Sequence, residues 1–163
     1  MKKLILLLAL VFTGFTTVFG QGVKLGINAG LPVGDISDAS NFQVGADVSY
    51  LYPATDMFSL GGLIGYSHFF MEDIDLPGGS VNMDDISFLP IAASARFGFS
   101  DFLFVGGDLG YAVGLSDGND GGFYYRPKVG YGLGKLAIIA SFAGISVDGG
   151  DVSSVNLGIE FGF

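Results

Sequence analysis

Residues 152–163 alternate strictly between apolar side chains and small or polar ones. Counting back from the end, every second residue is apolar, namely Phe163, Phe161, Ile159, Leu157 and Val155. The intervening residues are Gly162, Glu160, Gly158, Asn156 and Ser154. A period of two is that of a β-strand, whose successive side chains point to opposite faces. The segment therefore predicts a strand with one apolar face and one narrow, polar face, as in the wall of a membrane barrel.

The same alternation recurs along the rest of the chain, and no segment after residue 21 has helical periodicity. The alternating segments span residues 23–31, 41–52, 58–70, 86–99, 102–115, 123–133, 135–147 and 152–163. Most of them reach the roughly 9 to 11 residues that a tilted strand needs to cross a membrane. Their number is even, as in single-chain bacterial barrels. The pattern predicts an all-β protein, an eight-stranded antiparallel up-and-down transmembrane β-barrel.

The connections between the segments alternate in length and in composition. The longer or more acidic connections are residues 32–40, 71–85, 116–122 and 148–151, and the tight ones are 53–57, 100–101 and 134. Bacterial barrels have long external loops and short periplasmic turns. With both ends of the chain in the periplasm, we expect the first set to lie outside the cell.

Acidic residues are concentrated in these external loops. Eleven of them lie there: Asp35, Asp38, Glu72, Asp73, Asp75, Asp84, Asp85, Asp117, Asp120, Asp148 and Asp151. Carboxylate oxygens are hard ligands that suit divalent cations, but the run that begins at Asp117 has Lys128 where a calcium loop needs its last glutamate. We expect solvated loops, no metal and no cofactor.

Aromatic residues on the outward parity gather near the ends of the segments. One group comprises Tyr50, Tyr52, Phe58, Phe97, Phe99, Tyr131, Phe161 and Phe163, and the other Phe42, Tyr66, Phe70, Phe123 and Tyr125. Two aromatic belts around an apolar band are typical of the two membrane interfaces. The faces of segment 135–147 stay unassigned, because Ile139 and Ile145 fall on the inward parity.

Residues 1–20 predict a cleaved signal peptide, and residues 21–163 the barrel domain. Lys2 and Lys3 precede a short apolar core, which is below the roughly 20 residues of a membrane helix. The chain beyond residue 20 has five basic and sixteen acidic residues, a balance that excludes nucleic acid as a partner. It has no cysteine, which excludes thiolate chemistry and a lipid anchor on cysteine.

Seven charged residues fall on the inward parity, so they would face the narrow interior of the predicted barrel. They are Lys24, Asp47, Arg96, Asp108, Arg126, Lys128 and Glu160, four basic and three acidic. Charges removed from bulk water are tolerated when they are paired and hydrogen-bonded. An eight-stranded barrel is only just wide enough for its own side chains. We therefore predict an ion-pair network that plugs the lumen, with a narrow porin or channel for ions or small solutes as the alternative.

These features resemble the small outer-membrane β-barrel family, of the OmpA/OmpX-like or porin-like kind. The glycine-rich alternation is one shared feature. Another is the family's fourth-strand pattern of Leu or Ile, then Pro, then an aliphatic residue, which is present here as Phe88-Leu89-Pro90-Ile91. The resemblance implies a monomer in the outer membrane of a Gram-negative bacterium, in contact with lipid and lipopolysaccharide. It also implies that Ile159, Phe161 and Phe163 form an assembly signal that the outer-membrane assembly machinery recognises. We expect a structural or surface-interaction role.

His68 is the only histidine, so any catalytic histidine must be this one. A lipid A-modifying outer-membrane enzyme is a further alternative, because such enzymes work near the outer rim with His, Ser and an acidic residue. The neighbouring Ser67 points to the opposite face of the strand, so these two residues cannot form a dyad. We expect His68 to be an interfacial belt residue, and we expect no enzymatic activity.

Overall fold

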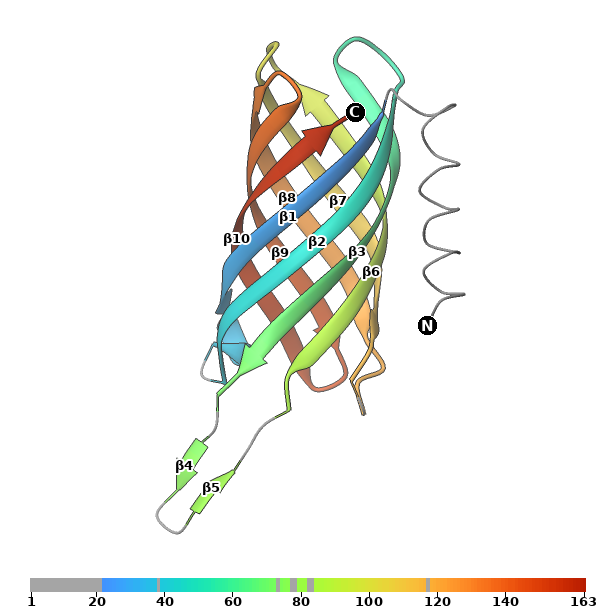
Figure 1. Ribbon diagram of the computed structural model, residues 1–163. Coiled ribbons are helices and arrows are strands. Elements are labelled where there is room, and N and C mark those ends of the chain that lie inside the picture. The colour runs from blue at the N-terminus through green and yellow to red at the C-terminus, as the bar shows by residue number, and fades with distance from the viewer. Residues whose placement is uncertain (1–21, 38, 73, 77–78, 82–83, 117) are drawn as a thin grey trace, which may run out of the picture.

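Eight long antiparallel strands close into a barrel (Figure 1). The structure is a computed structural model, and it describes residues 22–163 except 38, 73, 77–78, 82–83 and 117. The strands are β1 (Val23–Val33), β2 (Ser40–Pro53), β3 (Phe58–Met71), β6 (Ile86–Gly98), β7 (Leu103–Gly114), β8 (Gly122–Leu133), β9 (Leu136–Val147) and β10 (Gly150–Gly162). Each pairs with its neighbours along the chain, and β1 pairs with β10 to close the wall. The predicted fold class is confirmed; the predicted signal peptide lies outside the described residues.

The two ends of the barrel differ in their connections. We call the end with the start of β1 and the end of β10 the terminal end, and the opposite one the loop end. At the loop end lie the 3-10 turn η1 (Gly34–Ile36) and the short strands β4 (Ile74–Leu76) and β5 (Gly79–Val81). These two strands pair with each other and project beyond the barrel (Figure 1). The sequence predicted a loop here, because three-residue strands are too short to show an alternation.

The connection between β9 and β10 is tighter than predicted. Gly150 already pairs with Val147, so the turn consists of Asp148 and Gly149. Gly149 has a φ of 101°, which a residue with a side chain rarely adopts. This glycine allows the strands to reverse direction within two residues.

Large apolar side chains cover the outside of the barrel wall. Near mid-strand, Leu157 is 64% exposed, and Ile27 and Leu109 are each 59% exposed. A water-soluble protein does not expose a continuous apolar band of this kind, whereas a bilayer-spanning barrel requires one. Among the described residues, no helix combines the length and apolar character needed to cross a bilayer.

Aromatic rings contact one another at both ends of this band. At the terminal end the ring centroids of Phe161 and Phe163 are 5.2 Å apart, and at the loop end those of Phe42 and Phe70 are 6.2 Å apart. Further ring pairs are Phe97–Phe99, Phe102–Tyr131, Phe123–Tyr125 and Tyr125–Phe142. The rings lie where the sequence placed its two belts, with Phe102 and Phe142 as additional members.

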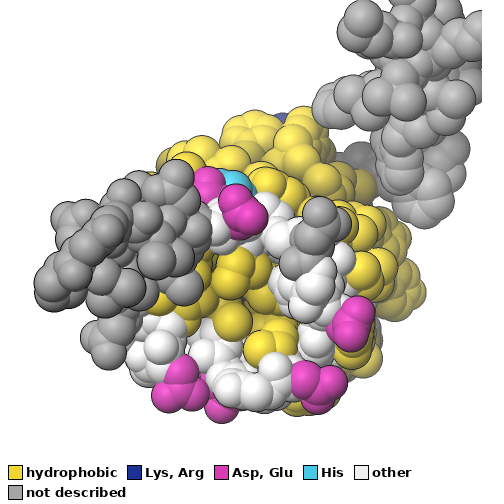
Figure 2. Space-filling view, turned by 90° about the horizontal axis from the view of Figure 1, so that it is seen from below, with side chains coloured by type: hydrophobic (Ala, Val, Ile, Leu, Met, Phe, Trp, Pro, Cys, Tyr) yellow, Lys and Arg dark blue, Asp and Glu magenta, His cyan; other side chains and the backbone are white. Residues whose placement is uncertain are grey.

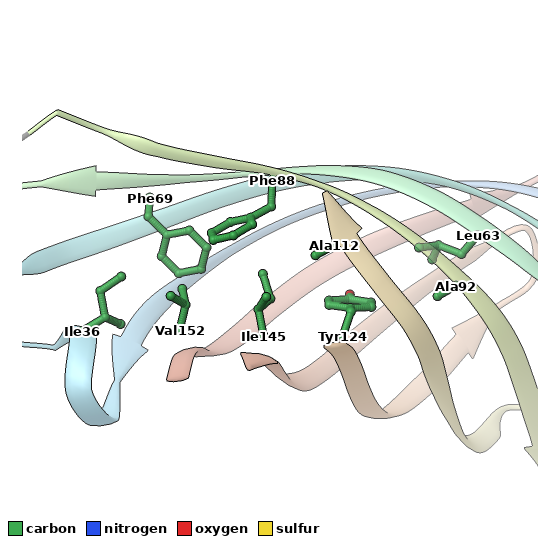
Figure 3. Close-up of a cluster of buried hydrophobic side chains, with 9 residues drawn as sticks. All are labelled: Ile36, Leu63, Phe69, Phe88, Ala92, Ala112, Tyr124, Ile145 and Val152. Atoms are coloured by element: carbon green, nitrogen blue, oxygen red, sulfur yellow. The ribbon is translucent and has the colours of Figure 1, made fainter. Parts of the chain in front are cut away.

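Apolar side chains fill the lumen toward the loop end (Figure 3). The cluster consists of Ile36, Leu63, Phe69, Phe88, Ala92, Ala112, Tyr124, Ile145 and Val152. Ile145 pairs across the strands with Val152, which explains why β9 is apolar on both parities. Its outward residue Ile138 is 43% exposed, whereas Ile145 is buried. The sequence interpretation expected small or charged residues throughout the lumen and missed this cluster.

Candidate functional site

Asp108 is the most deeply buried charge in the lumen, with an exposed fraction of 0%. Lys128 Nζ donates to both of its carboxylate oxygens, at 2.8 and 2.9 Å. Arg126 Nε donates to Oδ2 at 2.7 Å, and Ser94 Oγ donates to Oδ1 at 2.5 Å. Ser94 and Arg126 are the cross-strand partners of Asp108 on β6 and β8, so the register itself brings them together. The carboxylate is therefore held by four hydrogen bonds.

Arg126 also reaches across the lumen to the opposite wall. Its Nη1 donates to Asp47 Oδ2 at 2.9 Å, and Asp47 lies on β2, four strands away around the barrel. The partners of Asp47 on both neighbouring strands are glycines, Gly26 and Gly65. A Cβ atom on Gly26 would lie 2.8 Å from the Asp47 carboxylate. The inward glycines therefore provide the space that this ion pair occupies.

A second pair crosses the lumen nearer the terminal end. Arg96 on β6 donates to both carboxylate oxygens of Glu160 on β10, at 2.9 and 2.8 Å. Lys24 Nζ lies 3.7 Å from Glu160 Oε1. The Arg96 guanidinium also lies 4.0 Å from the centroid of the Phe104 ring, within the range of a cation–π contact. Paired nitrogens facing paired oxygens give this bridge both strength and a fixed direction.

The structure brings all seven inward charges into ion pairs. One group contains Asp47, Arg126, Asp108 and Lys128, and the other Lys24, Glu160 and Arg96. A cavity of about 20 Å³ lies between them, lined in part by Asp47, Arg126 and Glu160. This volume is enough for about one water molecule. The charged side chains of both groups point into the lumen at this level.

Three apolar residues at the end of β10 and just after it lie on the outside of the barrel. Ile159 is 45% exposed, Phe161 41% and Phe163 54%. The backbone N–H of Phe163 donates to the carbonyl oxygen of Val23 at 3.1 Å, which continues the seam between β10 and β1. All three side chains are accessible at the terminal end, and their role as an assembly signal stays a prediction.

His68 is part of a hydrogen-bonded cluster on the outside of the barrel, at the loop end. Its Nδ1 lies 2.8 Å from Ser87 Oγ, and its Nε2 lies 3.2 Å from Asp85 Oδ2. The Tyr66 hydroxyl lies 3.0 Å from Ser87 Oγ and 3.3 Å from His68 Nδ1. We call these four residues the rim cluster. Figure 2 shows the histidine beside acidic side chains at the rim.

The sequence interpretation compared His68 with Ser67 and so missed the serine that it meets. Ser67 lies on the inward parity, as expected, but His68 pairs across the strands with Ser87 on β6. The two residues are 19 positions apart in the chain. The strand pairing between segments 58–70 and 86–99 was the signal that could have identified Ser87.

The loop end carries exposed carboxylates around a largely apolar mouth (Figure 2). The exposed acidic residues among those described are Asp35, Glu72, Asp84, Asp85, Asp120, Asp148 and Asp151. The predicted loop residues Asp38, Asp73 and Asp117 lie outside the described residues. Within the described part of the chain, no three His, Asp or Glu side chains lie close enough together to hold a metal ion.

No family model matches the sequence, and no curated protein matches it. Among solved structures, the outer membrane protein Ail of Yersinia pestis in a phospholipid nanodisc has a TM-score of 0.58 at 18% identity, over 88% of this chain and 100% of Ail. The crystal structure of Ail has a TM-score of 0.56 at 18% identity, over 86% of this chain and 98% of Ail. A structure from the de novo design of transmembrane β-barrels has a TM-score of 0.53 at 13% identity, over 86% of this chain and 94% of the designed chain. The chain therefore has the fold of the small eight-stranded outer-membrane β-barrels, which confirms the resemblance indicated by its sequence.

Proposed function

We propose that the protein is a monomeric integral barrel of the bacterial outer membrane, with a structural or surface-interaction role and a closed lumen. The apolar band and its aromatic belts support contact with outer-membrane lipid and lipopolysaccharide. The observation that carries the proposal is the pair of ion bridges across the lumen, Arg96 to Glu160 and Arg126 to Asp47. A cavity of about 20 Å³ lies beside these bridges, lined in part by Asp47, Arg126 and Glu160.

Two different barriers lie in series along the barrel axis. The ion pairs occupy the terminal and central parts, and the apolar cluster with Phe69 and Phe88 occupies the part toward the loop end. A hydrated ion would have to displace both, and breaking a buried pair exposes uncompensated charge. The narrow channel is for this reason the less supported alternative.

Recordings across planar lipid bilayers test whether the lumen is closed. We expect the full chain, inserted as folded barrel, to give no stable unitary currents. The controls are Arg96→Ala and Phe88→Ala, which each weaken one barrier and should leave the other in place. Insertion is verified by the difference in gel migration between heated and unheated samples. Unitary currents from the wild type whose size changes in Arg96→Ala would overturn the closed-lumen proposal.

The surface role rests on the loop end. Its loops contain no lysine and no arginine, while the described carboxylates there are exposed. Ail has been crystallised with the heparin analogue sucrose octasulfate. Such a polyanion would meet carboxylates and no lysine or arginine in the loops of this chain, and like charges repel at close range. We propose that the loop end contacts cationic or neutral surfaces.

Retention on immobilised polylysine and immobilised heparin tests this charge preference. We expect the folded protein to be retained by polylysine at low salt and not by heparin. Asp35→Asn with Asp148→Asn removes two charges at the loop end, and Asp56→Asn with Asp101→Asn removes two at the terminal end. The first pair should elute at lower salt than the second if the loop end makes the contact. Retention on heparin, or equal elution of the two variants, would contradict the proposal.

A further inference from the structure

We propose that the rim cluster is a hydrolytic site for the fatty-acyl esters of lipids in the outer leaflet, an activity additional to the structural and surface role. Ser87 is its nucleophile, His68 its general base, Asp85 the group that orients the base, and Tyr66 the donor to the developing oxyanion. The inference rests on the contacts among these four side chains and on their position in the wall.

The contacts match the requirements of nucleophilic catalysis. A serine hydroxyl needs a general base within about 2.6 to 3.2 Å, and that base needs a third group to fix its orientation. His68 Nδ1 lies 2.8 Å from Ser87 Oγ, and the other ring nitrogen faces the Asp85 carboxylate at 3.2 Å. With the ring proton on Nε2 toward the carboxylate, Nδ1 is free to accept the serine proton.

Strand pairing and hydrogen bonds to neighbouring residues fix this arrangement. Ser87 and His68 are direct cross-strand partners of β6 and β3. The other oxygen of Asp85 accepts a hydrogen bond from the backbone N–H of Met71 at 3.0 Å. Ser116, just after β7, donates to the Asp85 carbonyl at 3.1 Å and accepts from the Ser87 N–H at 3.0 Å. The nucleophile therefore lies on a wall strand, and the acid, just before that strand, is held by hydrogen bonds to Met71 and Ser116.

Tyr66 supplies a donor beside the reacting oxygen. Its hydroxyl lies 3.0 Å from Ser87 Oγ, on the same face of β3 as His68. An ester carbonyl attacked by Ser87 develops negative charge next to this hydroxyl. Tyrosine is one of the side chains that stabilise such an oxyanion, and removing a donor of this kind typically costs about 10²- to 10³-fold in rate.

The surroundings identify the substrate class. The cluster faces outward, with the His68 ring 4.5 Å from Phe70 and 6.2 Å from Tyr66, centroid to centroid. Phe70 and Tyr66 are 42% and 43% exposed, in the aromatic belt of the loop end. Aromatic belts lie at the depth of lipid headgroups, with acyl chains on one side and water on the other. An ester bond between a headgroup and an acyl chain lies at this depth.

The reaction consumes only water. Ser87 Oγ attacks the ester carbonyl carbon while His68 Nδ1 takes the hydroxyl proton, and the carbonyl π electrons move to the oxygen beside Tyr66. The intermediate collapses, the alcohol leaves with the proton from His68, and the acyl group stays on Ser87. A water molecule then attacks the acyl-serine, passing its proton to His68. Collapse of this second intermediate releases the fatty acid and returns the proton to Ser87.

Two measurements on the folded, full chain test the proposal. The first reacts the wild type with an alkyl fluorophosphonate, in which an activated serine displaces fluoride. Peptide mass spectrometry should locate the label on Ser87, and this needs no variant. Absence of label on Ser87 would overturn the proposal.

The second measurement is release of free fatty acid from phospholipid vesicles and from vesicles that contain lipopolysaccharide. The wild type should release fatty acid in at least one arm, and the arm identifies the lipid. Ser87→Ala and His68→Gln should lower the rate by about 10²-fold or more. Ser67→Ala, adjacent to His68 but facing inward, should leave it unchanged. No release in either arm, or equal release by a Ser87→Ala variant that keeps the heat-modifiable migration of the wild type, would overturn the proposal.

Discussion

Replacing Asp108 with alanine should lower the free energy of unfolding by about 3 to 5 kcal/mol. The reason is what the substitution leaves behind, because Lys128 and Ser94 lose their carboxylate and Arg126 keeps only Asp47. An unpaired charge in the lumen can be neither rehydrated nor moved without opening the barrel. Urea unfolding of the protein in lipid vesicles, followed by gel migration, measures the loss.

Two variants separate this charge effect from a general effect of truncating a side chain. Asp101→Ala removes an exposed carboxylate in the turn before β7 and should change stability by less than about 0.5 kcal/mol. Asp108→Ala combined with Lys128→Met removes both charges and should recover part of the loss. If Asp108→Ala is no less stable than Asp101→Ala, the lumen network does not contribute as described.

An arginine at position 109 should destabilise the barrel by about 2 to 4 kcal/mol, because Leu109 faces lipid near the middle of β7. An arginine at position 133, where Leu133 is also exposed but ends β8 at the terminal end, should cost about 0 to 1 kcal/mol. Both substitutions replace an exposed leucine, so the difference between their losses of stability reports the depth of each position in the membrane. The unfolding experiment in vesicles provides the comparison.

A water-facing wall would give a different result. In water, both arginines would be solvated, and the two variants would have nearly equal stability. Equal losses of stability from arginine at positions 109 and 133 would therefore contradict the assignment of the outer face to lipid.

The alternation of side chains was sufficient to predict the eight barrel strands, and the faces of all of them except β9. A period of two fixes which side of the wall each residue occupies, because a shift by one residue would turn every apolar side chain into the lumen. Leu157 and Ile159 lie outward and Glu160 inward, as their parity requires. The three-residue strands β4 and β5 were not predictable, since three residues give too few positions to reveal a period.

Parity predicted the members of the lumen network but not their partners. Arg96 and Glu160 are 64 positions apart, and Arg126 and Asp47 are 79 apart. Which charges meet depends on how far successive strands are staggered around the closed barrel. This stagger comes from the whole set of strand pairings, which a single segment does not encode.

The same limit explains the features that were missed. Phe69 and Phe88 were on the inward parity, but their ring contact, 6.1 Å between centroids, joins two strands. Ser87 and His68 likewise become neighbours only through the pairing of β3 with β6. Both the apolar cluster and the rim cluster are products of register, and register was the quantity that the sequence interpretation left undetermined.

The most direct test of the closed barrel measures whether a water-soluble reagent reaches the lumen. The chain has no cysteine, so thiol labelling reports only on cysteines that are introduced. Ser49 and Ser154 line the lumen and are 2% and 1% exposed, whereas Ser100 lies in an exposed turn. In the folded protein, a charged thiol reagent should modify Ser100→Cys rapidly and should modify Ser49→Cys and Ser154→Cys only after unfolding. Rapid modification of both lumen cysteines in the folded barrel would contradict a closed lumen.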